Sequence, residues 1–455
     1  MDRRTAIFLV AIVVLMVGAG AGLLVLMRRI GPAPGEREPP GDLAGSYLAE
    51  VEEQCSLKYA RPAVGGSERP DGASAGYYLE ALDMLPALSD VEWAQILDNT
   101  IVDSWNGDSP PDLTAAAQFA PSAARVLEGA SRPDGRSPYA FCAVDTDADI
   151  LGPYRRLARG MEILARARCR SGDEKSAASL LAATLQMELD LGRGGGIVGH
   201  AVSISLAVET CTRALVAFAE VARDPAVLRD LGRDLSALDG AWLDLGDNVR
   251  LDGLVEETLY ASCFMPEGWD APVGPPVIGP EDRKSICGLG PDLAGGMWKA
   301  TRERNAEILG ALSAPTCTKR HEKLLAIEER TGRSSVLEKI LRPQEALAGL
   351  AAPAVSPRLL EDVHAHTVLV LARAVVALRL LALETGLLPS VLDEPSWSRL
   401  EDDGRPLGDV YTGRRPLYTL EGGVVTLSSP GSTSGMEPAS VTASLLSHMS
   451  GAPVP

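Results

Sequence analysis

Aromatic residues are scarce in this chain and make up only 4% of its 455 residues. Strands favour aromatic and β-branched side chains, whereas alanine and leucine, which fill long stretches here, favour helices. The shortage therefore excludes a mainly β architecture and predicts a mainly α-helical fold. Since 46% of the residues are hydrophobic, the chain is still able to bury a sizeable core.

The chain also lacks any block of lysine and arginine, and its formal net charge is −18. A field of that sign repels phosphate backbones, so we expect no nucleic-acid partner. An acidic surface of this kind is compatible with a protein or peptide partner.

Sequence motifs of known catalytic sites are missing as well. The sequence contains no Walker A loop, no SxxK, no HExxH and no cysteine in a recognisable catalytic context. The segment GSTSG at 431–435 places Thr433, not serine, at the position of a nucleophile elbow. No catalytic residue is therefore assigned, and no cofactor is expected.

Cysteine is infrequent, and none of the seven cysteines belongs to a CxxC pair. This spacing gives no support to a zinc ribbon or a thioredoxin-like redox site. The best disulfide candidate is Cys263 with Cys287, because these two residues bracket a loop rich in proline and glycine. Closing that loop would stabilise the fold by a few kcal/mol. The alternative is a reduced chain with scattered buried cysteines.

What the chain does have is a long apolar run at its N-terminus. Residues 5–27 carry no charge and lie between Arg3-Arg4 and Arg28-Arg29. As a helix this run would span roughly 34 Å, enough to cross a bilayer. We predict a single-pass transmembrane signal-anchor, with residues 1–4 in the cytoplasm and the bulk of the chain translocated. A cleaved signal peptide, with its site at Ala19-Gly20-Ala21, is the alternative.

The rest of the chain divides by composition into four parts. We predict a Pro/Gly linker at 28–45, a helical domain at 46–386, a small tail with a β-hairpin at 387–428, and a disordered end at 429–455 with a brief helix near 441–448. Apolar residues recur at helical spacing in Tyr77–Met84, Ser89–Trp105, Pro153–Arg170, Lys175–Leu191, Ile197–Arg223, Met297–Leu312 and Leu359–Thr385.

Residues 157–191 predict a helical hairpin that turns at Ser171-Gly172-Asp173. Small residues, Ala177 and Ala178, stand where close helix packing requires them. The unit resembles one degenerate tetratricopeptide (TPR) hairpin, although no 34-residue period repeats elsewhere.

The run from 359 to 385 is nearly apolar and could be taken for a second membrane span. Arg373 and Arg379 interrupt it, and each would cost about 2.5–3.5 kcal/mol at a bilayer centre. We predict the central helix of a soluble domain, with both arginines emerging at its edges.

The end of the chain changes character after Gly386 and Pro389. Two β-rich runs, Pro416–Leu420 and Val424–Ser428, flank a Glu-Gly-Gly turn and predict a hairpin. The region resembles the C-terminal tail of G-type pseudopilins, which carry a helix, a G-x-x-P exit, an aspartate-plus-aromatic turn and a closing hairpin. The residues that match are Gly386, Pro389, Asp409, Tyr411, Gly413, Pro416 and Tyr418.

The match has departures, since Val410 replaces the expected proline and the N-terminus lacks the prepilin cleavage pattern. The chain is therefore no pilin, and no calcium site is carried over. Together with the helical hairpin, the tail resembles membrane-anchored helical proteins of high-GC bacteria, for which no activity is implied. That resemblance supports this architecture, and together with the signal-anchor arrangement we predict a protein of the bacterial inner membrane with the bulk of the chain in the periplasm.

Two patterns suggest metal ligands but fit poorly. Asp145, Asp147 and Asp149 have the spacing of an EF-hand loop, but Ile150 and Arg156 replace its glycine and its bidentate acid. His364 and His366 form an HxH pair, yet on a helix the two rings would point about 200° apart. We therefore predict no metal site.

Adjacent acids at Glu256 and Glu257 are expected to lie on the solvated edge of a helix rather than to form an acid/base dyad.

The stretch LGRGGGIVGHAVSI at 191–204 contains the spacing GxGxxG at Gly194, Gly196 and Gly199. A dinucleotide fingerprint needs a strand before the first glycine, whereas the preceding residues predict a helix. We therefore expect no nucleotide, and instead a turn between two helices in which Gly194 or Gly196 has positive φ.

These observations favour a membrane-anchored scaffold or protein-interaction module over an enzyme. The tail resemblance adds an expected link to secretion or pilus-type envelope machinery. The alternative is an envelope hydrolase whose site is assembled from scattered residues. A groove lined by small apolar residues would favour the first, and a cleft with converging acids or histidines of raised pKa would favour the second.

Overall fold

The computed structural model describes residues 49–50, 53, 73–97, 105, 116–137, 151–261, 291–332, 355–401, 405–430 and 438–445. The transmembrane segment predicted at 5–27, the linker at 28–45 and the candidate pair Cys263 and Cys287 lie outside these residues. So do Asp145, Asp147 and Asp149. Each of these stays a prediction from the sequence.

The described chain is mainly helical, which confirms the expectation drawn from its composition. Its helices are α3 (Ala75–Asp83), α4 (Asp90–Leu97), α6 (Ala120–Ala130), α7 (Leu151–Arg170), α8 (Glu174–Gly192), α9 (Gly196–Glu209), α10 (Val216–Val221), α11 (Pro225–Gly240), α12 (Leu245–Ala261), α14 (Pro291–Leu312), α15 (Cys317–Gly332), α18 (Val355–Thr385) and α19 (Glu394–Leu400). A π-helical segment, η1 (Thr210–Leu215), joins α9 to α10 without a break.

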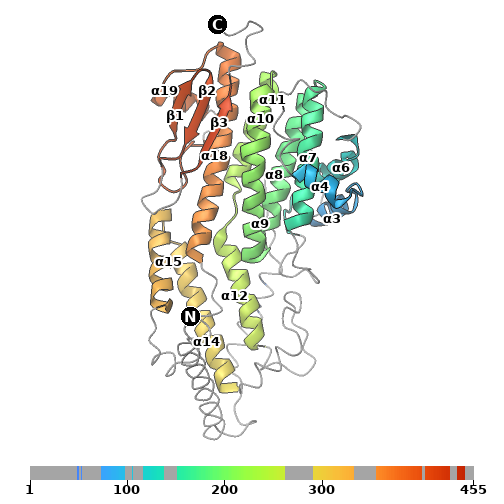
Figure 1. Cartoon of the computed structure of the whole chain (residues 1–455). Coiled ribbons are helices and arrows are strands. Elements are labelled where there is room, and N and C mark those ends of the chain that lie inside the picture. Colours follow the sequence, from blue (N-terminus) through green and yellow to red (C-terminus); the bar gives the residue numbers. More distant parts are fainter. Residues whose placement is uncertain are drawn as a thin grey trace, which may run out of the picture.

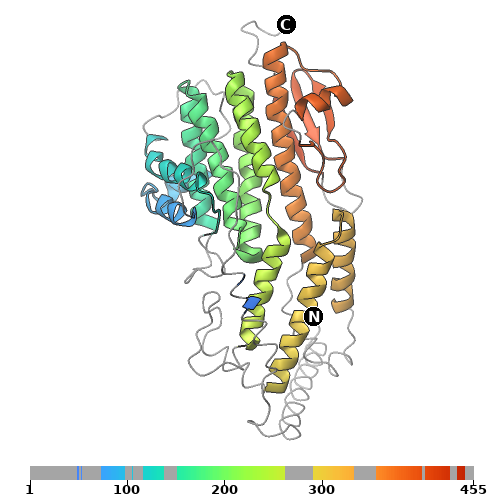
Figure 2. The same ribbon diagram turned by 180° about the vertical axis from the view of Figure 1, so that it is seen from behind.

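The long helices stand side by side in an elongated bundle (Figure 1). In its centre α8 packs against α7, α9 and α11, while α18 packs against α9 and α11. The small helices α3, α4 and α6 cover α7 and α8 on one side, and a small sheet covers α18 on the other (Figure 2). Helices α12 and α14 extend the bundle beyond the start of α9.

The predicted helical hairpin is present as α7 and α8. Gly172 adopts φ +89° in its turn, and the Asp173 side chain caps α8 by accepting the N–H of Ser176 at 3.1 Å. Ala177 and Ala178 are buried, so the two helices approach closely at this end. Its resemblance to a TPR unit stays a prediction.

The glycine stretch forms a turn between two helices, as expected. It follows α8, so a helix stands where a dinucleotide fold requires a strand. Gly194 and Gly196 adopt φ of +77° and +66°. A Cβ built on Gly199 would lie 3.0 Å from the Leu191 carbonyl oxygen, which shows how closely α9 approaches the end of α8.

Helix α18 is the central buried helix of the bundle, but its two arginines do not emerge at its edges. Arg379 is 0% exposed, and Arg373 is buried as well. Arg379 Nη2 donates to the Ala222 carbonyl at 3.0 Å, and Nη1 donates to the Leu445 carbonyl. The expectation was wrong because backbone carbonyls and acids of neighbouring elements, invisible in the local sequence, satisfy both guanidinium groups inside the fold.

Two helical stretches in the described part of the chain are long and apolar enough to cross a membrane, Gly196–Val221 and Val355–Thr385. Both are mostly buried inside the bundle, and core helices of globular proteins meet the same criteria.

The C-terminal sheet has three antiparallel strands in the order β1 (Leu417–Glu421), β2 (Val424–Ser428) and β3 (Ser440–Ser444). The β1–β2 hairpin was predicted. The expectation of disorder over 429–455, with a brief helix near 441–448, is wrong for β3. Here Val441 and Ala443 alternate with polar residues, and their buried side chains pack with β2 against α10 and α18. The surrounding Ser, Gly and Pro content obscured this short alternation.

Candidate functional site

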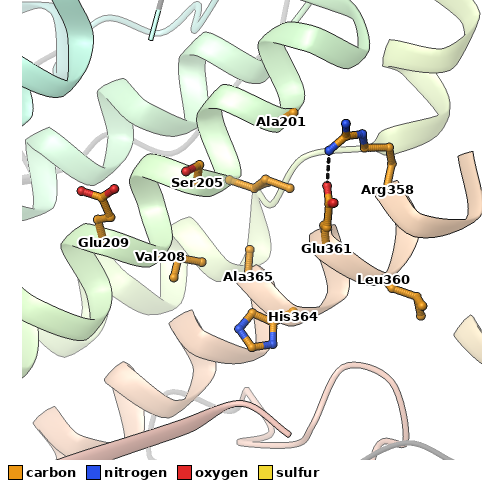
Figure 3. Close-up of a pocket in the computed structure, with 10 residues that line it drawn as sticks. Ala201, Ser205, Val208, Glu209, Arg358, Leu360, Glu361, His364 and Ala365 are labelled. Carbon is orange, nitrogen blue, oxygen red and sulfur yellow. Dashed lines mark hydrogen bonds and ion pairs between the residues drawn. The ribbon is translucent and has the colours of Figure 1, made fainter. Parts of the chain in front are cut away.

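A pocket of about 590 Å³ lies between α9 and α18, and we call it the α9–α18 groove. All of its lining residues belong to these two helices (Figure 3). They are Ala201, Ile204, Ser205, Val208, Glu209, Arg358, Leu360, Glu361, His364 and Ala365.

Helical periodicity explains the groove. Ala201, Ile204, Ser205 and Val208 follow the spacing i, i+3, i+4, i+7, which places them along one face of α9. On α18 the residues at 361, 364 and 365 repeat the same geometry. Small side chains, alanine and serine, leave room between the two helices, and the larger apolar ones supply the walls.

Charged groups stand at both ends of the groove. At one end Arg358 donates to Glu361 on the next turn of α18 (Figure 3). Both side chains are more than two-fifths exposed, so this pair contributes little to stability and its partners are able to turn toward a ligand. His364 lines the wall nearby.

At the other end Glu209 is held by two arginines of α7. The Glu209 carboxylate accepts from Arg155 Nη2 and Arg159 Nη2, each at 2.9 Å. Arg159 is itself buried and also binds the buried Glu162. This end of the groove is thus connected to ionisable groups inside the bundle.

We define the buried charge cluster as three buried residues, Arg159, Glu162 and Glu188, together with the partly exposed Glu209 that they meet at the groove. Glu188 is 0% exposed, and its Oε1 accepts the Thr210 hydroxyl at 2.7 Å. Burial raises the pKa of Glu188 well above its ordinary value, and burial also raises the pKa of Glu162. Thr210 begins the π-helical segment η1, a type of irregularity that is frequent at functional sites.

The HxH pair lies within the continuous helix α18, and its two rings diverge, as predicted. His364 lines the groove, whereas His366 Nε2 lies 2.5 Å from Asp239 Oδ1 on α11. The His366 ring also stacks on Trp242, with centroids 4.5 Å apart. Within the described part of the chain, no three His, Cys, Asp or Glu side chains are placed to hold a metal ion together.

A second polar network was not visible in the sequence because its members are far apart in the chain. His200 Nε2 lies 3.0 Å from Asp362 Oδ1, which also accepts from Trp242 Nε1 at 2.9 Å. His200 Nδ1 lies 3.2 Å from Asn248 Nδ2. Since the ring is fully buried and both nitrogens have partners, His200 fixes α9 against α12 and α18 and offers no base to a substrate.

Glu256 and Glu257 lie on α12, as expected for a helix, but they are not at a solvated edge. Glu257 is buried, and Glu256 binds Arg304 on α14. Burial raises the pKa of Glu257 to about 7, while the charge of Arg302 opposes that rise. The expectation was wrong because the apposed arginines of α14, distant in sequence, turn this edge into an interface.

The thiols in the described residues have the character of core groups. Cys169, Cys211 and Cys317 are free. Burial raises the pKa of Cys169 to about 12 and that of Cys317 to about 11. These three thiols therefore stay protonated and are poor nucleophiles.

Comparison with known proteins found no matching family model, no matching curated protein and no matching solved structure. The resemblance of the C-terminal region to pseudopilin tails stays a prediction from the motif.

Proposed function

We propose that this chain is a single-pass, membrane-anchored binding module whose α9–α18 groove takes an amphipathic helix of a protein partner. Its anchor is the apolar run at 5–27, and the helical bundle faces the periplasm of a bacterial cell. The pseudopilin-like tail suggests that the partner belongs to secretion or pilus-type envelope machinery.

The groove carries this proposal. Its walls combine small side chains, Ala201, Ser205 and Ala365, with apolar ones such as Ile204 and Val208. Apolar grooves between two helices suit an amphipathic partner helix, whose anchor side chains enter at helical spacing. A few such anchors in a desolvated pocket provide most of the binding energy of an interface.

The charges at the ends of the groove favour a protein segment over a small ion. Arg358 and His364 offer positive or donor groups, while Glu361 and Glu209 offer carboxylates. Because positive and negative groups occur within one pocket, a complementary partner must also carry both. A helix with mixed charges on its flanks meets this requirement.

Site-specific photocrosslinking in membranes tests the proposal. We expect p-benzoylphenylalanine at Ser205, which is exposed in the groove, to yield a discrete adduct with one protein. Placed at Val198, an exposed residue of α9 outside the groove, the same group is expected to give no such adduct. Mass spectrometry of the adduct should place the crosslink on an amphipathic helix of the partner.

A filled groove supplies the matched control. Ala201→Trp adds an indole to the wall, and we expect it to abolish the Ser205 adduct while the thermal unfolding profile stays cooperative. Glu361→Arg, an exposed change, should weaken the adduct even if the tryptophan disturbs folding. Equal adducts from Ser205 and Val198, or an adduct that survives both changes, would refute the proposed groove.

The anchor is tested separately by fractionation of the full chain. We expect the intact protein to stay with membranes after alkaline carbonate extraction. Release of the uncleaved protein into the soluble fraction would contradict a membrane anchor.

An envelope hydrolase is the second candidate, and one observation favours it. The carboxyl groups of Glu162 and Glu188, with raised pKa values, belong to the same cluster as Glu209, which faces the groove. Both are sealed from solvent, so a substrate would have to open the bundle to reach them. Ester or peptide hydrolysis by the pure protein, lost in Glu209→Gln, would favour this candidate over the binding module.

A further inference from the structure

A second pocket, of about 670 Å³, lies at the opposite end of α18 from the groove, between α11, α18 and α19. We call it the arginine pocket. Its interior is apolar and is built by leucine and valine side chains of α11, α18, α19 and the segment between α19 and β1. The main apolar lining residues are Leu228, Val376, Leu380, Leu381, Leu400 and Leu407.

Four arginines line the same pocket: Arg229 and Arg233 from α11, Arg373 from α18, and Arg399 from α19. Among the lining residues Glu384 is the one carboxylate. In a chain with a net charge of −18, this concentration of guanidinium groups around an apolar interior makes a local site for an anion.

The ion pairs of these arginines leave donors available. Arg229 binds Glu384 through one nitrogen at 2.7 Å, and Arg233 pairs with Asp230 one turn earlier on α11. Arg399 is exposed and has no ion-pair partner among the described residues. A guanidinium group carries five N–H donors, so a single carboxylate does not exhaust it.

Arg373 gives the pocket a fixed element. Its side chain is buried, and its guanidinium group is held by Asp239 and Ser236 of α11. The other three arginines lie toward the solvent, at the rim. The site therefore has an apolar interior below a positively charged rim, a polarity that matches a ligand with an apolar body and an anionic head.

We propose that the arginine pocket binds a single-chain anionic amphiphile, a long-chain fatty acid, with its acyl chain against the leucines and its carboxylate at the arginine rim. A volume of this size lies within the range of about 300–1,000 Å³ that holds one small molecule. Arginine binds carboxylates in a bidentate, charge-assisted manner. This site is separate from the α9–α18 groove and does not depend on the function proposed for it.

Photolabelling of the full chain in nanodiscs tests this site, with a fatty acid that carries a diazirine in its chain as the probe. We expect labelled peptides from α11, α18 and α19. Hexadecanoate should compete with the probe, whereas hexadecanol, which has no charge, should compete about ten-fold less well. An acidic, apolar peptide should not compete.

Matched variants assign the labelling to the pocket. Arg399→Glu reverses an exposed charge, and we expect it to reduce labelling about ten-fold, since a charge-assisted hydrogen bond is lost and repulsion replaces it. Arg250→Glu, on α12 and outside the pocket, should leave labelling unchanged. Leu380→Trp should block labelling by filling the interior, whereas Ala201→Trp in the groove should not.

Three results would overturn the proposal. Labelling confined to peptides outside the pocket would exclude the site, and equal competition by hexadecanol would exclude recognition of the carboxylate. Competition by the acidic peptide at lower concentrations than hexadecanoate would assign the pocket to a protein partner.

Discussion

The hydroxyl of Thr210 donates a 2.7 Å hydrogen bond to Glu188 Oε1 and so joins the first residue of the π-helical segment to the C-terminal part of α8. Both side chains are buried, and the second carboxyl oxygen of Glu188 has no hydrogen-bond partner in the described structure. A carboxyl group in this position is costly to ionise, because one hydroxyl does not replace its hydration.

Glu188→Gln should therefore stabilise the protein at neutral pH. The raised pKa of Glu188 means that the folded state keeps a proton which the unfolded chain releases above its ordinary pKa of 4.5. The unfolded state then binds fewer protons, so the free energy of unfolding falls as pH rises from about 4.5 toward the folded-state pKa. Glutamine keeps the acceptor for Thr210 and does not ionise.

Thermal unfolding between about pH 4 and pH 8 checks this. We expect the variant to equal the wild type at the acidic end and to exceed it by several degrees in Tm at the neutral end. Glu361→Gln, at an exposed site, is the control. A Tm difference that is the same at every pH would contradict a pKa-linked effect.

Arg302→Gln should raise the pKa of Glu257 further above about 7. Burial raises this pKa, and the charge of Arg302, whose Nη1 lies 3.3 Å from Glu257 Oε2, opposes the rise. Carboxyl ¹³C NMR on protein labelled at glutamate side chains measures the midpoint. Arg330→Gln, at a largely exposed pair with Glu307, should leave it unchanged. An unchanged or lower midpoint in Arg302→Gln would show that the Arg302 charge does not act on Glu257.

Gly196→Ala should destabilise the turn between α8 and α9. Gly196 has φ +66°, and a Cβ there would lie 2.3 Å from Asp252 Oδ1, which belongs to the carboxylate that accepts the N–H of Ile197. We expect a loss of about 2 kcal/mol from the strained backbone and the displaced carboxylate. Gly310→Ala, in open space on α14, should instead stabilise by about 1 kcal/mol. Urea unfolding of both variants makes the comparison, and a similar effect of the two changes would rule out a special role for Gly196.

Arg379→Met should weaken the attachment of β3 to the bundle. The arginine donates to Ala222 and Leu445, and its removal leaves these buried carbonyls without donors, at a cost of about 1–3 kcal/mol each. Relative to the wild type, the amides of β3 should exchange faster in the variant, and those of α8 should be much less affected. Arg250→Met, at a half-exposed site, is the control. Unchanged exchange in β3 would mean that the pairing with β2 and the packing of Val441 and Ala443 hold the strand without Arg379.

The sequence predicted those parts of the fold that depend on local pattern. Helical spacing identified the α7–α8 hairpin and α18, and the Glu-Gly-Gly turn identified the first two strands. The glycine stretch was correctly predicted to be a turn between two helices, because the residues before it carry helical spacing. Strand β3 was not predicted, because its alternation covers only five residues within a segment of loop-like composition.

The polar interior was much less predictable than the helices. Arg379, Glu257 and His200 each depend on partners from distant segments, and nothing near them in the chain shows whether a charge will be satisfied inside the fold. The α9–α18 groove was unpredictable for the same reason. The face of α9 was visible as a pattern, but its apposition to α18, more than a hundred residues later, follows from tertiary packing.

The bond between Arg379 and the Leu445 carbonyl gives this fold a particular order of completion. During translation, α18 leaves the ribosome before residue 445 has been synthesised, so the guanidinium group stands in a nearly finished bundle with one acceptor missing. Arrival of β3 supplies that acceptor and closes the edge of β2 in the same step. A chain without β3 would therefore carry an exposed edge of β2 together with a guanidinium group that lacks one of its two acceptors, so this short strand completes the sheet and the polar interior at once.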